Sequence, residues 1–90
     1  MSATLTVRHN VEDYAAWRKV YDEAEVLRAQ HGCTAARVMR RPADGNDLFV
    51  THDFATVEQA EGFAHDPKLR ETMGRAGVQG VPQIEIFTDV

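Results

Sequence analysis

Residues 4–9 alternate between polar and apolar side chains, a period of two that is typical of a strand with one buried face. The same alternation returns over residues 34–41, 47–54 and 83–88, which we predict to be three further strands. Residues 42–46 read Pro-Ala-Asp-Gly-Asn, a concentration of turn-forming residues. The second and third strands are therefore predicted to form a hairpin.

Between the first two strands, apolar residues recur at spacings of three and four, the period of an amphipathic helix. This stripe consists of Tyr14, Trp17, Tyr21, Ala24 and Leu27. Asn10 is the predicted N-cap, because Glu12 and Asp13 follow it with the charge that a helix N-terminus favours. Gly32 is a typical stop signal, so we expect a single helix that ends there.

A second helical region follows the third strand. Thr56 and Gln59 have the spacing of a capping box, which predicts a helix start. The pair Asp66-Pro67 predicts a break and a new start, since aspartate caps helices and proline suits their first position. Gly77 is the predicted end, and residues 78–82 are expected to form a loop before the last strand.

The order β-α-β-β-α-β predicts a ferredoxin-like α+β fold that occupies residues 1–90 as one domain. Its standard packing is one antiparallel four-stranded sheet, in the order 4-1-3-2, with both helices on one face. The face that the helices should cover is apolar and carries Leu5, Val7, Ala36, Val38, Leu48, Val50, Phe54, Ile84 and Ile86.

The opposite face of the predicted sheet mixes charged and apolar residues. It includes Phe49, Phe87 and Met39 among charged side chains. We expect this face to bind a second copy of the chain, with a solvated sheet face as the alternative. Four charged residues on it are expected to pair across strands or across the dimer: Arg8, Arg37, Asp53 and Glu85.

Composition narrows the class of protein. The 90 residues carry a net charge of −4, which argues against binding to nucleic acid. The sole cysteine, Cys33, excludes an intramolecular disulfide. We recognise neither a targeting segment nor an apolar run long enough to span a membrane, so we expect a cytoplasmic protein that does not bind membranes.

Three segments carry a resemblance to a known family. Phe54 closes the third strand, residues 56–60 (TVEQA) open the next helix, and residues 63–73 (FAHDPKLRETM) span its break. With the order of elements, these resemble the dimeric α+β-barrel superfamily and, within it, the antibiotic biosynthesis monooxygenase-like proteins. The resemblance implies a homodimer joined through its sheets. It also implies cofactor-free oxidation of aromatic substrates, haem degradation, isomerisation or ring closure.

Two positions argue against haem degradation. The haem-degrading branch of the superfamily carries a tryptophan and, ten residues later, the histidine that ligates iron. Aligned on the break at Asp66-Pro67, these positions are Phe63 and Met73 here. A thioether alone would be an unusual protein ligand for haem iron, so we expect no haem and no other cofactor.

Two of the four histidines are candidates for acid–base chemistry. His9 and His52 fall on the helix-covered face of adjacent strands. If Leu5 lies opposite His52, the two imidazoles are about 13 Å apart at ~3.3 Å per residue, too far to share a metal. His52 is the stronger candidate, with a core histidine bonded to backbone as the alternative. His31 and His65 lie at helix ends and are expected to be structural.

The aromatic side chains of the first helix predict a flat, apolar binding pocket for a small hydrophobic or aromatic ligand. We expect Trp17 and Tyr14 to line it, ahead of Tyr21, with Phe63 and Met73 on the second helix. Ordinary core packing is the alternative for all of them.

These observations predict a small cofactor-independent monooxygenase-like enzyme that acts on an aromatic or polyketide-like substrate. Two alternatives stay open: an isomerase or cyclase that only transfers protons, and a non-catalytic dimeric binding or accessory protein. Oxygen consumption during turnover separates the isomerase or cyclase from the monooxygenase. The pocket tests the non-catalytic alternative, since binding chemistry there is disfavoured without a cavity of about 300 Å³.

Overall fold

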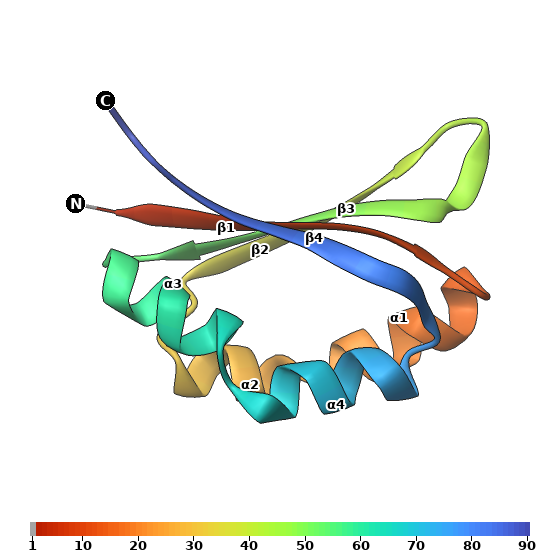
Figure 1. Ribbon diagram of the computed structural model, residues 1–90, viewed down its shortest axis with the longest axis horizontal. Helices are drawn as coiled ribbons and strands as arrows, with labels where there is room; N and C mark the ends of the chain where they lie inside the picture. Colours follow the sequence, from red (N-terminus) through yellow and green to blue (C-terminus); the bar gives the residue numbers. More distant parts are fainter. Residues whose placement is uncertain (1) are drawn as a thin grey trace.

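One antiparallel sheet and one layer of helices make up the structure, with all helices on the same side of the sheet (Figure 1). The computed structural model describes residues 2–90. Its elements are β1 (Ala3–Val11), α1 (Tyr14–Glu23), α2 (Glu25–Gln30), β2 (Ala35–Arg41), β3 (Asp44–Phe54), α3 (Val57–Ala64), α4 (Pro67–Arg75) and β4 (Val78–Thr88). The predicted ferredoxin-like α+β fold is confirmed.

The sheet has the order β2-β3-β1-β4, as predicted. In the β1–β3 pair, Leu5 lies opposite His52 and His9 lies opposite Leu48. The alternation of the two strands is kept in this register, since a slip of one residue would turn every apolar side chain to the other face. Both histidines therefore face the helices, as the sequence predicts.

The core lies between the central strands and the helices. Its largest fully buried side chains are Phe54, Phe63, Leu5, Leu48 and Val50. Ala36 lies opposite His52 on the predicted face, but it is exposed, so the expectation that the helices cover it is wrong. It lies on β2, which forms one edge of the sheet.

The first helix begins later than predicted. Asn10 belongs to β1, and the N-cap is Asp13, whose carboxylate accepts a hydrogen bond from the N–H of Ala16 at 3.0 Å. Pairing of β1 with both neighbours extends that strand to Val11 and moves the start of the helix. The side chain of Asn46, from the β2–β3 hairpin, also accepts from the N–H of Tyr14 at 2.8 Å.

The predicted single helix is in fact two, because the chain breaks at Ala24 (φ −82°, ψ 7°). The break has no proline or glycine to announce it. At the break the carbonyl of Tyr21 accepts from the N–H of Ala24 at 3.2 Å and from the guanidinium of Arg28 at 2.9 Å. Gly32, with φ +82°, follows the end of α2 as predicted.

The second helical region is broken where the sequence predicts. Thr56 caps α3 by accepting from the N–H of Gln59 at 3.2 Å, while the Gln59 side chain accepts from the N–H of Ala55. Asp66 caps α4 by accepting from the N–H of Lys68 at 2.9 Å, with Pro67 in the first turn. These caps fix where α4 lies over the sheet.

Two predicted loops are shorter than expected. Residues 78–82 belong to β4, where Val78 pairs with Val11. A register shift at Arg8–Asn10 and the positive φ of Gly80 accommodate the extra residues. The β2–β3 turn is likewise reduced, since Arg41 already pairs with Asp44.

The helices leave the second face of the sheet uncovered (Figure 1). Phe49 and Phe87 are 37 % and 54 % exposed on it. Arg8 forms an ion pair across strands, but its partner is Asp47, at 3.2 Å, and not one of the charged residues predicted for this face. No helix in residues 2–90 is long and apolar enough to cross a bilayer.

Candidate functional site

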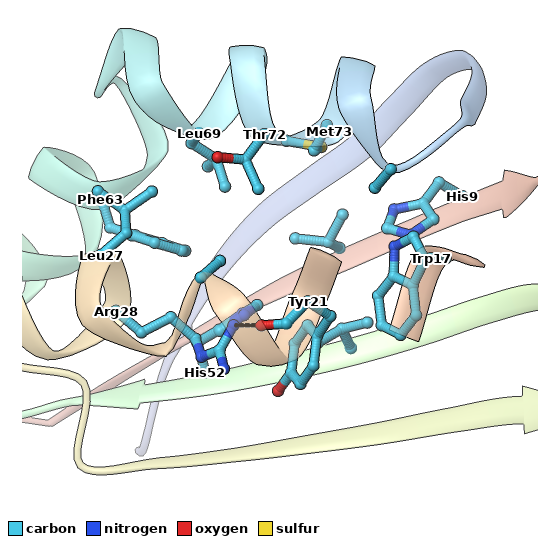
Figure 2. A pocket seen from close by; sticks show the side chains of 14 residues that line it. His9, Trp17, Tyr21, Leu27, Arg28, His52, Phe63, Leu69, Thr72 and Met73 are labelled. Atoms are coloured by element: carbon cyan, nitrogen blue, oxygen red, sulfur yellow. Dashed lines mark hydrogen bonds between the residues drawn. The ribbon is translucent and has the colours of Figure 1, made fainter. Parts of the chain in front are cut away.

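An apolar cavity lies between the sheet and the helices (Figure 2). Strands β1 and β3 form its floor, and the four helices form its walls and roof. Its main lining residues are Val7, His9, Trp17, Tyr21, Leu27, Arg28, Val50, His52, Phe63, Leu69, Thr72 and Met73. The volume is about 50 Å³. That is room for a few water molecules and well short of the ~300 Å³ of a usual ligand site.

His52 is buried at the floor of the cavity, with 5 % of its surface exposed. Its ring centre lies 5.1 Å from that of Phe63, and within residues 2–90 its Nδ1 has no hydrogen-bond partner. Burial, reinforced by the positive charge of Arg28, lowers the pKa of His52 to about 4. The imidazole is therefore neutral near pH 7 and has a nitrogen free to bond or take a proton from a ligand.

His9 occupies the other end of the floor, beside Trp17 at a ring-centre distance of 5.8 Å (Figure 2). Neither of its ring nitrogens has a partner in the described part of the chain. Burial lowers its pKa as well. An unbonded buried polar atom costs about 1–3 kcal/mol, so these nitrogens favour a ligand or a water that bonds them.

The two histidines stay apart, as the strand register requires. Across residues 2–90 no group of three or more His, Cys, Asp or Glu side chains is placed to hold a metal ion. The site therefore places the two imidazoles at separate positions in an apolar cavity.

The aromatic stripe of α1 contributes differently from the prediction. Trp17 and Tyr21 line the cavity and stack at 4.9 Å with an interplanar angle of 20°. Tyr14 stacks on the other side of Trp17 at 5.9 Å but lies outside the lining. Its position at the first residue of α1, bonded to Asn46, and the guanidinium of Arg40 over its ring keep it at the hairpin. Tyr21, placed second by the sequence, is the lining tyrosine.

Phe63 and Met73 both line the cavity as expected, Phe63 from α3 and Met73 from α4. Phe63 also contacts His31 at a ring-centre distance of 5.7 Å. His31, at the C-terminal end of α2, is paired with Asp66 at 2.7 Å and lowers the pKa of that carboxyl. Its role is thus to connect α2 with the start of α4, in line with the structural interpretation.

Arg28 is the charged side chain among the lining residues that were not predicted from the sequence. Its guanidinium lies 3.9 Å from the ring centre of Tyr21. The signal was present, since residues 17, 21, 24 and 28 continue the stripe at spacings of four, three and four. A charged side chain in that pattern is usually directed to solvent, so the sequence did not predict that Arg28 lines the cavity.

Comparison with solved structures places this fold among known proteins. SnoaB, a cofactor-independent oxygenase from Streptomyces nogalater, matches with a TM-score of 0.80 and 13 % identity over 99 % of this chain and 93 % of its own. A candidate antibiotic biosynthesis monooxygenase from Bordetella bronchiseptica matches with a TM-score of 0.81 and 16 % identity, over 99 % and 97 %. The chain has the fold of the antibiotic biosynthesis monooxygenase-like proteins.

A candidate protein of the same kind from Caulobacter crescentus matches with a TM-score of 0.77 and 18 % identity, over 99 % of this chain and 90 % of its own. No protein-family model matches the sequence, and a search of curated proteins finds no match either. At these identities the likeness shows the fold, and function has to be argued from the cavity.

Proposed function

We propose that the protein is a small cofactor-independent monooxygenase that binds a flat aromatic or polyketide-like molecule between the sheet and the helices. The observation that carries this proposal is the pair of buried imidazoles, His9 and His52, whose unbonded nitrogens lie in an apolar cavity. The shared fold with SnoaB, a cofactor-independent oxygenase, supports the reaction class.

In the proposed reaction His52 acts as the base. It takes a proton from an activated CH₂ group of a phenolic substrate and leaves a carbanion that reduces molecular oxygen. The CH₂ group becomes C=O with one oxygen atom of O₂, and the other oxygen atom leaves as water. Trp17 and Tyr21 form the wall on which the flat substrate lies, and His9 bonds a polar group at its far end.

The energetics permit this role. With a pKa of about 4 for His52, removing a proton from a group of pKa about 10 costs roughly 8 kcal/mol at 1.36 kcal/mol per unit. A turnover of ~10 s⁻¹ allows a total barrier of about 16 kcal/mol. The free-energy cost of the proton transfer is therefore below this barrier, even without the attraction between the imidazolium and the new anion.

The proposal includes a homodimer that covers the open sheet face and a cytoplasmic location. Two large apolar side chains, Phe49 and Phe87, are exposed on this face beside the half-buried Met39. Packing a second sheet against them would remove this apolar surface from water.

A non-catalytic binding or accessory protein is the second candidate, and the volume of about 50 Å³ favours it. Under the first proposal, an aromatic ligand enters only if side chains move. Met73 is long, flexible and only partly buried, so it is the side chain best able to do so.

Oxygen uptake tests the proposal. The protein is incubated with a panel of polycyclic phenols that carry an activated CH₂ group, and dissolved oxygen and products are followed together. One O₂ consumed per quinone formed supports the monooxygenase. Turnover without oxygen uptake would instead assign an isomerase or cyclase. Failure of every phenol to bind or react would leave the non-catalytic candidate.

A further inference from the structure

Arg28 is a cation without a carboxylate partner at the edge of an apolar cavity. The ion pairs within residues 2–90 use Arg8, Arg18, His31 and Arg41. Arg28 is only partly exposed, yet it takes part in none of them. A partly desolvated charge with no counter-ion is unfavourable by itself and becomes favourable when an anion binds.

The guanidinium is held in place by the break between α1 and α2. One of its nitrogens donates to the carbonyl of Tyr21 at 2.9 Å, and its Cζ lies 3.9 Å from the ring centre of the same residue. This uses one of five N–H donors, so four remain for a ligand. A fixed guanidinium with free donors is the geometry that recognises carboxylates in a bidentate manner.

Arg28 lies where the cavity meets the outer surface of the protein. Arg28 and Tyr21 line both the cavity and a groove on the outer surface, and they are the residues common to the two. Two acidic side chains, Asp22 and Glu25, also line the groove. Asp22 is paired with Arg18 at 3.1 Å, and Glu25 forms no ion pair with Arg28. The charge of Arg28 is therefore available to an incoming ligand.

The geometry points to Arg28 as the specificity-determining residue of the cavity, which selects aromatic ligands that carry an acidic group over their neutral counterparts. This inference rests on the proposed function, since it assumes that the cavity binds a flat ring. Arg28 and His52 lie at the same end of the cavity (Figure 2). A carboxylate or phenolate there would bond the guanidinium while the rest of the ring system extends towards Trp17 and His9.

A matched pair of probes tests the inference: 2-naphthoate, which is an anion at pH 7, and 2-naphthamide, its neutral counterpart. Trp17 is the only tryptophan of the chain and lines the cavity, so quenching of its fluorescence reports binding there. A charge-assisted bond of about 1.5–3 kcal/mol predicts a naphthoate preference of roughly ten- to a hundredfold.

Three variants separate charge from structure. Arg28→Gln keeps a polar amide but has no charge, and we expect it to bind both probes with affinities within threefold. Arg28→Lys restores the charge and should restore most of the preference. Lys19→Met is the matched control, because Lys19 is an exposed cation of α1 that lines neither the cavity nor the groove. Circular dichroism confirms that each variant is folded.

The outcomes are distinct. Equal binding of both probes to the wild type, or a preference that survives Arg28→Gln, overturns the role of Arg28 and leaves the proposed cavity intact. Binding of neither probe overturns the inference together with the proposed function. A preference that is lost in Arg28→Gln, regained in Arg28→Lys and kept in Lys19→Met supports it.

Discussion

The imidazole of His52 lies 5.1 Å from the ring of Phe63, with 51° between the two planes. The contact joins a side chain of β3 to one of α3 and keeps the imidazole in an environment with little water. Desolvation penalises the protonated form, which is why the pKa of His52 falls to about 4. The same contact thus holds the layers together and makes the imidazole a neutral acceptor at the cavity.

The first prediction concerns stability and pH. The unfolded chain binds a proton at His52 with a pKa near 6.5, whereas the folded chain does so only near 4. The free energy of unfolding should therefore fall as pH drops from 6.5 to 4, by about 3 kcal/mol from this residue, and no further below.

Urea unfolding at a series of pH values measures this dependence. The variant His52→Phe has no titrating group at this position and should show a flatter profile between pH 4 and 6.5. His65→Phe, at an exposed position, serves as the control and should keep the wild-type profile. Parallel profiles for His52→Phe and the wild type would refute the neutral buried imidazole.

The second prediction concerns cavity size. Met73 is a partly buried lining residue on α4, and its replacement by alanine should enlarge the volume of about 50 Å³. We expect Met73→Ala to bind 2-naphthoate at least threefold more tightly, because less rearrangement is needed, while losing some stability. Arg70→Ala, exposed on the same helix, should leave binding unchanged. Calorimetry measures both, and tighter binding in neither variant would argue against a ligand at this place.

The third prediction concerns association. Phe49 and Phe87 are exposed on the uncovered sheet face, so we expect the wild type to sediment as a dimer at micromolar concentration. The double variant Phe49→Asp/Phe87→Asp should sediment as a monomer, because charges on both sheets would face each other. Val26→Asp, an exposed apolar residue on the helical side, is the control and should remain dimeric. A stable wild-type monomer would contradict the proposed interface.

Much of the fold was accessible from the sequence because its signals are local. Alternation placed Leu5 and His52 on the same face of the sheet, and a capping aspartate followed by proline located the break before α4. The break at Ala24 was not predicted. At this break the side chain of Arg28 bonds the carbonyl of Tyr21, which lies seven residues earlier in the chain. Such a contact leaves no local mark in the sequence.

The site was only partly accessible. Polarity and period predicted that His9, His52, Trp17 and the lining residues of α3 and α4 face one layer. Tyr21 lines the cavity in place of Tyr14 because Asn46, from the distant hairpin, bonds the N–H of Tyr14 and fixes where α1 begins. Cavity volume depends on how closely the layers pack, and periodicity carries no information about that distance.

Turnover by His52→Ala tests most directly whether His52 is the base of a ligand-binding cavity. On a phenol that the wild type oxidises, kcat/KM should fall at least tenfold while the dimer persists, and added imidazole should restore part of the activity. His65→Ala, with an exposed histidine removed, should match the wild type. Wild-type turnover by His52→Ala would contradict the claim.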